Sequence, residues 1–358
     1  MRLMENFIIC IVLFGAFACT CSAQEINPLK LEEPGSNRDL TFQDIWKAFG
    51  PAQIRNQSAL KVSALEWLPD NPETIPVGKS RADFSITYAN HWGDMPQYFL
   101  DGETARMELR FALGVRDDLE FEVTYAGFWR GGGIFDSYIE NFHSFFRITQ
   151  SRRTNYPRNQ LAFLLDPKDP DTKYIITNKN AGFGDGDITL KLKYQIIEPR
   201  FNYRPAMTFS TIAKVPVGNS DDNFTVRAFE FCGHFTMRQR ITHRAFIYAA
   251  LGLTYTDADK IWEVEIRPTR WFWFIGVEWR IFYRWSLNLQ YEWESGIARP
   301  KEYQKMLSWP TNLVTIALQW RPEIDKDYYI EFATNENTLF HSNTPDIAFH
   351  VAIKFFFN

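Results

Sequence analysis

The chain has 358 residues, and its 39 Lys and Arg residues against 43 Asp and Glu residues give a net charge of −4. Because these charges are spread along the chain, the composition argues against a nucleic-acid-binding protein. Of the four cysteines, only Cys232 lies beyond residue 23, which excludes a fold held by internal disulfides for the rest of the chain. Aromatic residues make up 16% of the sequence, a heavy load for a chain without long apolar stretches.

Residues 1–23 have the layout of a secretory signal peptide. Arg2 stands near the start, an apolar run follows at 7–14, and small residues precede Gln24. The order of charge, apolar run and small residues is that of a cleaved signal, and the run is too short to cross a bilayer as a helix. We therefore expect an exported protein.

Residues 24–78 come before the first clear strand and are expected to form an N-terminal periplasmic or plug segment. Within it, residues 41–49 space their apolar side chains by three and four after Thr41. This spacing, with a Thr-x-x-Asp cap, predicts a short helix.

From residue 79 to residue 358 the sequence alternates apolar and polar residues, which predicts strands with one apolar and one polar face. Many of these segments are roughly 11–13 residues long, longer than the usual globular strand and enough to cross a membrane at a tilt. Aromatic residues gather at their ends, as in the girdles of outer-membrane barrels. The clearest segments are 81–88, 106–115, 119–129, 187–196, 271–281, 285–293, 314–320 and 346–357.

Short turns and longer connections also alternate along this part of the chain. Short turns are expected at 116–118, 198–203, 239–242, 282–284 and 322–326, and longer loops at 92–102, 131–156, 217–223, 257–267, 295–310 and 337–344. Outer-membrane barrels have short periplasmic turns and long outer loops. The sequence thus predicts an all-β, antiparallel transmembrane β-barrel of the outer-membrane type with 12 to 14 strands. The runs 159–165 and 173–177 form an extra hairpin or belong to an outer loop.

One long loop contains a predicted helix. After three glycines, the apolar residues of 134–146 fall on one helical stripe, as in an amphipathic helix. Because an outer loop offers no core, we expect this helix to fold inward over the barrel mouth. Asp136 and His143, two turns apart, would then face the lumen or its rim. The alternative is that the stripe packs onto neighbouring loops.

Four motifs occur in order along the chain: 50–57 (GPAQIRNQ), 75–78 (IPVG), the segment 135–143 after the glycines, and 182–187 (GFGDGD). Together they resemble an uncharacterised family of Gram-negative outer-membrane barrel proteins, domain of unknown function family 3187. The resemblance covers essentially the whole chain beyond the signal and implies a barrel design, without an agreed activity. The final Asn358 departs from the aromatic residue that ends many such barrels.

No pattern in the sequence predicts a catalytic residue, a cofactor site or a metal site. His143–Ser144 and His341–Ser342 are neighbours, and adjacent side chains point apart on a helix or strand. Residues 182–187 carry the glycines and carboxylates of a calcium loop, but their spacing fits no full ligand set. A tight turn entering a strand is favoured there.

The polar strand faces carry both charge signs, so inside a barrel they would line water or pair with one another. Arg55, Asn56 and Gln57 join Asp136 and His143 as candidates for contact with a solute, if residues 24–78 fold into the lumen. A periplasmic tail or an extra strand is the alternative.

The sequence thus favours passive passage or binding of a small solute in the outer membrane of a Gram-negative cell. The alternative is a structural or surface-interaction barrel without transport, and a lipid-modifying enzyme comes third. Expected partners are outer-membrane lipid, the barrel assembly machinery acting through the C-terminal strand, and a small-molecule solute.

Overall fold

The computed structural model describes residues 47–147, 152–165, 174–198, 205–218, 224–323, 327–337 and 344–357. The chain divides into two units, Met1–Asp44 and Ile45–Asn358, and all described residues belong to the second. The expected signal peptide and residues 41–46 of the expected helix lie outside the described residues. Residues 47–49, the described end of that helix, are not helical.

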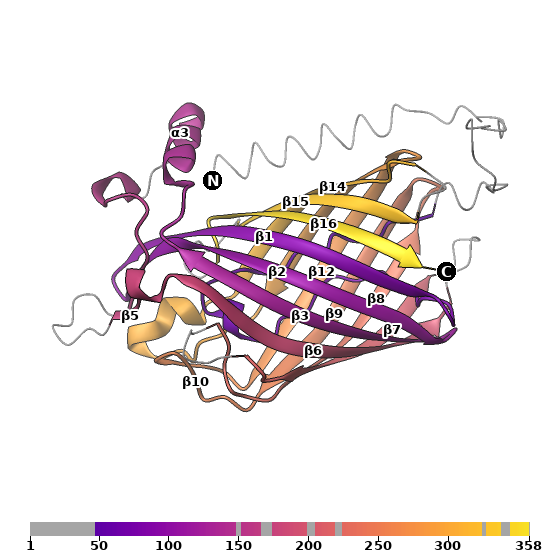
Figure 1. The fold of residues 1–358 in the computed structure, drawn as a ribbon, viewed down its shortest axis with the longest axis horizontal. Helices are drawn as coiled ribbons and strands as arrows, with labels where there is room; N and C mark the ends of the chain where they lie inside the picture. Colours follow the sequence, from indigo (N-terminus) through magenta and orange to yellow (C-terminus); the bar gives the residue numbers. More distant parts are fainter. Residues whose placement is uncertain are drawn as a thin grey trace. The chain divides into compact units, whose positions relative to one another are not determined.

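Twelve antiparallel strands close into a barrel (Figure 1). β1 pairs with both β2 and β16, so the first and last strands join and each of the twelve has two neighbours. The strands are β1 (Ser80–Met95), β2 (Tyr98–Arg116), β3 (Leu119–Gly131), β6 (Gly182–Ile197), β7 (Ala206–Val215), β8 (Glu230–Arg240), β9 (Ala245–Thr256), β12 (Thr269–Phe282), β13 (Trp285–Glu294), β14 (Thr311–Trp320), β15 (Tyr328–Asn337) and β16 (Ile347–Phe357). The predicted outer-membrane type of barrel is confirmed.

The connections carry the smaller elements. β4 (Ala162–Leu165) and β5 (Tyr174–Thr177) pair with each other and form the extra hairpin. β4 also pairs with the first residues of β2, so the hairpin extends the sheet beyond the twelve strands of the barrel wall. The others are β10 (Lys260–Ile261), β11 (Val264–Glu265), α3 (Asp136–Phe146) and the short 3-10 helices η1 (Lys61–Ser63), η2 (Arg153–Asn155), η3 (Asn178–Asn180) and η5 (Glu302–Ser308). No helix in the described ranges is long and apolar enough to cross a membrane.

Short turns lie at one end of the barrel together with the C-terminus, and the longer connections lie at the other (Figure 1). We call these the turn end and the loop end. The prediction of a long loop at 92–102 is wrong. β1 and β2 continue there as a paired two-stranded ribbon, which ends where Met95 lies opposite Tyr98. The reason is that Trp92, Phe99 and their neighbours are buried there, so the ribbon has a packed face beyond the barrel.

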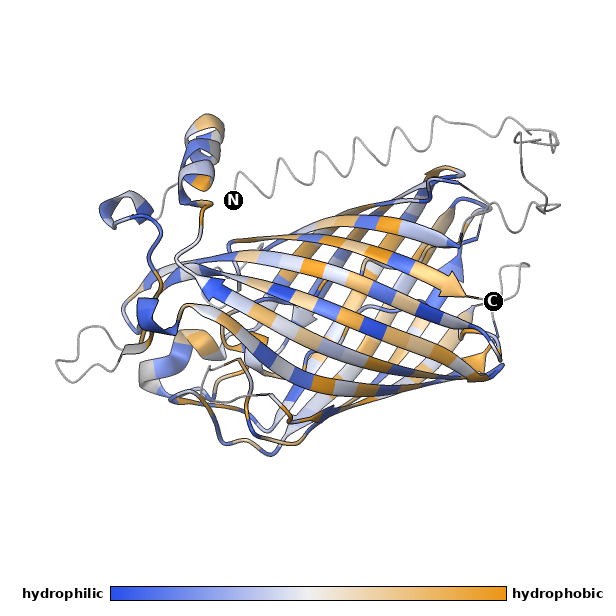
Figure 2. Cartoon of the chain, viewed as in Figure 1, coloured by the Kyte–Doolittle hydropathy of each residue, from blue (hydrophilic) through white to orange (hydrophobic). Residues whose placement is uncertain are grey.

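The barrel is polar inside and apolar outside. On β16 the side chains of His350 and Lys354 are buried, whereas Val351 between them is 48% exposed. On β12, Glu278 is fully buried next to Val277, which is 41% exposed. Figure 2 shows this alternation along neighbouring strands. The period of two in the sequence therefore places the charges inward and the apolar surface where lipid would lie.

Leu289 tests which face meets lipid. It lies in the middle of β13, points outward, and stands between Val277 and Ile316 on the neighbouring strands. Leu289→Arg should cost ~2–4 kcal/mol of unfolding free energy in phospholipid vesicles, because a cation near the bilayer midplane is poorly solvated. Leu289→Met is the control and should unfold at almost the wild-type urea concentration. Similar midpoints for both variants would place this face away from lipid.

Candidate functional site

Residues 47–75 lie inside the barrel, and we call them the plug. Every residue from 48 to 70 is buried. The plug starts near the turn end, where the Tyr329 hydroxyl donates to the Phe49 carbonyl. It reaches the loop end around η1, where Leu60 packs with Leu307, and it returns to the turn end, where the Thr74 hydroxyl donates to the Asp117 carbonyl. The plug therefore crosses the lumen twice without joining the sheet.

Carboxylates of the wall hold the plug by its backbone. The plug has no sheet ladder to satisfy its amides, and buried amides need acceptors. Inward-facing glutamates on four strands supply them. The bonds run from Phe49 N (2.9 Å) and Gly50 N (3.1 Å) to Glu278, from Gln53 N to Glu331 (2.9 Å), from Leu65 N to Glu230 (2.7 Å), and from Ile75 N to Glu120 (2.9 Å).

Arg55, the first of the candidates, joins the plug to β2. Its Nε donates to Glu108 at 2.6 Å, and Arg106 donates to the same Glu108 oxygen at 2.7 Å. Arg110 lies 3.9 Å from the other oxygen. One buried carboxylate thus faces three guanidinium groups, and Glu108 is the anion on which this part of the lumen depends.

Asn56 and Gln57 follow Arg55 in the same buried stretch. The Asn56 side chain accepts from Ser58 N at 2.9 Å and donates to the Thr311 hydroxyl at 3.3 Å. The Gln57 Oε1 is buried and has no hydrogen-bond partner among the described residues. Although buried acceptors normally have a partner, contact of Arg55, Asn56 or Gln57 with a solute stays a prediction.

Further ion pairs tie the second half of the plug to the wall. Lys61, fully buried, pairs with Glu294 of β13 and donates to the Thr311 hydroxyl at 3.1 Å. Asp70 lies 2.6 Å from Lys191 and 3.2 Å from Lys193, both on β6. The inward charges therefore pair with the plug as well as with one another.

Asp136 and His143 lie apart from this set, on α3 at the loop end. Figure 1 shows α3 beyond the outline of the barrel, and on its stripe Tyr138 is 54% and Phe145 81% exposed. The prediction that this helix folds inward over the mouth is therefore wrong.

Contacts at the start of α3 give the physical reason. The amides of Ile134 and Phe135 donate to Glu103 at 2.9 and 2.7 Å. Asp136 is buried against Arg153, 3.1 Å away, and accepts from Asn159 N at 2.7 Å. These bonds fix the helix start at the rim and use the Asp136 carboxylate as an anchor. Contact of Asp136 or His143 with a solute stays a prediction.

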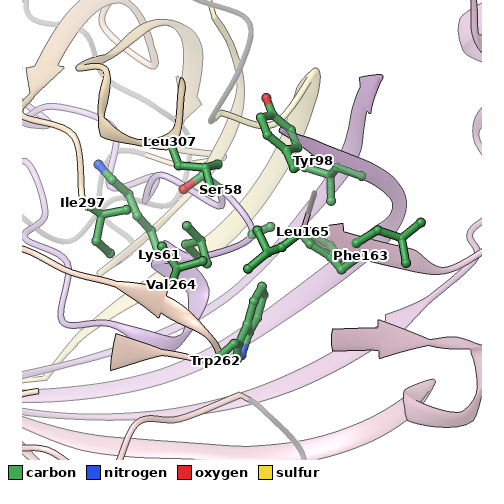
Figure 3. A pocket seen from close by; sticks show the side chains of 13 residues that line it. Ser58, Lys61, Tyr98, Phe163, Leu165, Trp262, Val264, Ile297 and Leu307 are labelled. Atoms are coloured by element: carbon green, nitrogen blue, oxygen red, sulfur yellow. The ribbon is translucent and has the colours of Figure 1, made fainter. Parts of the chain in front are cut away.

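Two pockets lie on either side of η1. The pocket on the loop side is apolar and has about 510 Å³ of empty space, part of it open to solvent. Figure 3 shows its lining, which comes from the plug, the β1–β2 ribbon and three loops. The second, of about 310 Å³ and also partly open, is lined by charged side chains, among them Arg55, Glu66 and Lys214.

The residues that line the apolar pocket were not predicted from the sequence. Phe163, Trp262 and Leu307 fall in connections, where single apolar residues carry no periodic signal. Residues 182–187, weighed as a calcium loop, begin strand β6, and Asp187 pairs with Lys214 at 3.2 Å. Within the described ranges, no group of three or more His, Cys, Asp or Glu residues is arranged to hold a metal ion.

One family, described as "Protein of unknown function (DUF3187)", matches residues 43–357. Among solved structures, the COG4313 outer membrane channel from Pseudomonas putida F1 is similar to this chain with a TM-score of 0.54 at 11% identity, over 81% of this chain and 99% of that one. The NanC porin gives a TM-score of 0.44 at 7% identity, over 77% and 98%. The first likeness supports the fold, and the second carries no further weight. No curated protein matches the sequence.

Substitution of the two partners in the Arg55–Glu108 contact should have unequal effects on stability. Glu108→Gln leaves three buried guanidinium groups without their anion, whereas Arg55→Met leaves Glu108 paired with Arg106. Loss of the partner of a buried charge costs ~3–5 kcal/mol, so Glu108→Gln should lower the urea midpoint of the purified barrel clearly more than Arg55→Met. The opposite order would show that Arg55, and not Glu108, organises this cluster.

Proposed function

This chain belongs to the DUF3187 family, and we propose that it is an outer-membrane barrel for passive passage or binding of a small solute, closed in this state by its plug. The family brings no activity with it, so the proposal rests on the lumen. The main support is that the plug, which is not part of the barrel wall, fills the lumen and is held there by hydrogen bonds and ion pairs.

A location in the outer membrane is supported by the outward apolar face and by the placement of long and short connections. Outer-membrane barrels have short periplasmic turns and longer outer loops, so the turn end and the C-terminus would face the periplasm. The outward aromatic residues Phe355 and Phe357 at the end of β16 suit recognition by the assembly machinery and contact with lipid.

The contacts of the plug are of a kind that water can replace. Its amides and side chains bind carboxylates, amides and hydroxyls of the wall. A hydrogen bond contributes only ~0.5–1.5 kcal/mol net between neutral groups and ~1.5–3 kcal/mol where one partner is charged, because water takes the place of the lost partner. Displacement of the plug would therefore turn the same charges into a hydrated pathway, as in polar barrel interiors.

Two other functions remain as alternatives. In a structural barrel the plug would be a permanent filling that stiffens the wall, and its removal would open no pathway. An enzyme comes third: His143 and Ser144 are adjacent on α3 and so do not face each other, and His341 and Ser342 lie outside the described residues.

Removal of the plug tests passage against the structural alternative. Deletion of residues 48–74 should give a larger and steadier single-channel current in planar bilayers than the full chain, because the deletion empties the lumen. A folded deletion variant that conducts no better than the full chain would favour the structural barrel.

Glu278→Gln is a milder version of the same test, because Glu278 accepts from the amides of Phe49 and Gly50. Hydrogen bonds to a charged group contribute ~1.5–3 kcal/mol, so loss of the charge should raise the open fraction by about 10- to 100-fold. Glu336→Gln, on the exposed side of β15, is the matched control and should leave the open fraction unchanged.

Orientation is tested by cysteine labelling in a Cys232→Ser background. Asp117 lies exposed in the turn between β2 and β3, and Asn141 lies exposed on α3. In intact cells a membrane-impermeant thiol reagent should modify Asn141→Cys and spare Asp117→Cys, while both should react after lysis. Reaction of the 117 variant alone would reverse the proposed orientation, and equal reaction of both would contradict it.

A further inference from the structure

We propose that α3 lies on the membrane surface beside the loop end of the barrel, where its exposed apolar side chains enter the boundary between lipid headgroups and acyl chains. The partner is a lipid surface that carries phosphate groups. The inference goes beyond the proposed function. It requires that the barrel sit in a membrane, but it depends neither on the plug nor on passage of a solute.

α3 is attached to the outer face of the barrel wall. Ile86 on β1 is 40% exposed and marks the outward face of that strand, and Tyr88 and Asn90 follow it at the spacing of two that keeps side chains on one face. Asn90 lies opposite Glu103 of β2 and donates to its carboxylate at 3.2 Å. The same carboxylate accepts from the two amides just before α3. The helix therefore begins outside the wall, on the side where lipid would lie.

The start of α3 coincides with the end of the outward apolar face. Phe135, the residue before the helix, packs edge to face on Tyr88 with ring centroids 5.2 Å apart, and its ring lies 5.8 Å from that of Phe349 on β16. Tyr88 also stacks with Trp129 of β3 at 6.1 Å. Beyond this aromatic group, the next outward residue of β1 is the polar Asn90. Because aromatic residues gather at the two interfaces of a membrane barrel, α3 begins where lipid gives way to water.

α3 has two exposed sides of unlike polarity. Tyr138 (54% exposed) and Phe145 (81%) lie two turns apart on the same side, and Ile134 (74%) precedes Tyr138 by about one turn. The second exposed side is polar and consists of Ser137, Asn141 and Ser144. At 3.6 residues per turn it lies roughly a quarter of a turn from the apolar side. An exposed apolar side next to an exposed polar side is the pattern of a helix in a membrane interface.

The direction of α3 suits this position. Figure 1 shows that the helix runs across the barrel and not along it, beyond the outline of the barrel at the loop end. Since the membrane normal follows the barrel axis, a helix with this direction lies along the membrane surface. One side of the helix can then face lipid over its whole length while another faces water. A helix parallel to the barrel axis would instead carry Phe145 away from the membrane.

The charge around α3 favours a lipid surface with phosphate groups. Residues 134–159 contain four arginines and two carboxylates, a net charge of +2 in a chain of net charge −4. Arg147, just after α3, is exposed. The side chains of Arg152 and Arg158 are 72% and 58% exposed, although each also pairs with one carboxylate. Guanidinium groups bind phosphate well. A second copy of the chain would bring the same positive charge to this surface and be repelled.

The position of α3 is measured with a nitrobenzoxadiazole fluorophore attached to Phe145→Cys or to Asn141→Cys, each in the Cys232→Ser background. The full chain is placed in phosphatidylcholine nanodiscs with or without phosphatidic acid. The probe at 145 should lose most of its emission to spin-labelled lipid and little to aqueous iodide. The probe at 141, on the polar side, should show the reverse. Phosphatidic acid should increase the lipid quenching at 145, and high salt should remove this increase because it screens exposed charges.

Tyr138→Cys repeats the measurement from a second position on the apolar side and should behave as the 145 variant does. Strong iodide quenching at 138, 141 and 145 alike would place α3 in water and overturn the proposal. Protection of the apolar side from both quenchers would mean that protein covers it, which would also overturn the proposal. An equal response with and without phosphatidic acid would reject phosphate as the recognised group. A barrel whose conductance does not respond to plug deletion would leave all these readouts unchanged, so failure of passage is distinguishable from failure of this inference.

Discussion

The need to satisfy a charged interior governs this structure. Closing twelve alternating strands places a ring of carboxylates and cations inside, and each must find a partner or water because a buried unpaired charge is costly. The plug supplies those partners: its backbone amides bind Glu278, Glu331, Glu230 and Glu120, and Asp70 binds Lys191 and Lys193. The wall in turn gives the plug the acceptors that a ladder would have provided. Without the other part, the charges of the wall and the amides of the plug would need water as their hydrogen-bond partner.

Around η1 the plug separates two layers. The pocket on the loop side is lined mainly by apolar side chains, and Arg55 and Glu66 line the charged pocket on the other side. Elsewhere at the loop end charges are again buried in pairs, as Asp136 is with Arg153. Ions are poorly solvated among apolar side chains, so the apolar layer separates the charged layer from the solvent at the loop end.

Most of the barrel could be predicted because one local rule, the period of two, fixes which side chains point inward. Lys354 and Val351 are assigned to opposite faces by that rule alone, and the structure confirms both. The path of the plug could not be predicted from the sequence, because the segment has no periodic pattern of apolar residues. Its partners also lie far away in the sequence: Phe49 binds Glu278, more than 200 residues further on. The α3 prediction failed for a similar reason: its direction is set by Glu103 and Arg153, which the helix sequence does not contain.

Lys61 connects the two layers physically. Its stem lines the apolar pocket, and its ammonium group binds Glu294 of β13 and the Thr311 hydroxyl of β14. Under the proposed function, displacement of the plug would separate the Lys61–Glu294 pair and uncover the apolar lining of the pocket in the same step. A buried charge that loses its partner is costly, so the lumen opens only if water solvates both groups as the plug leaves.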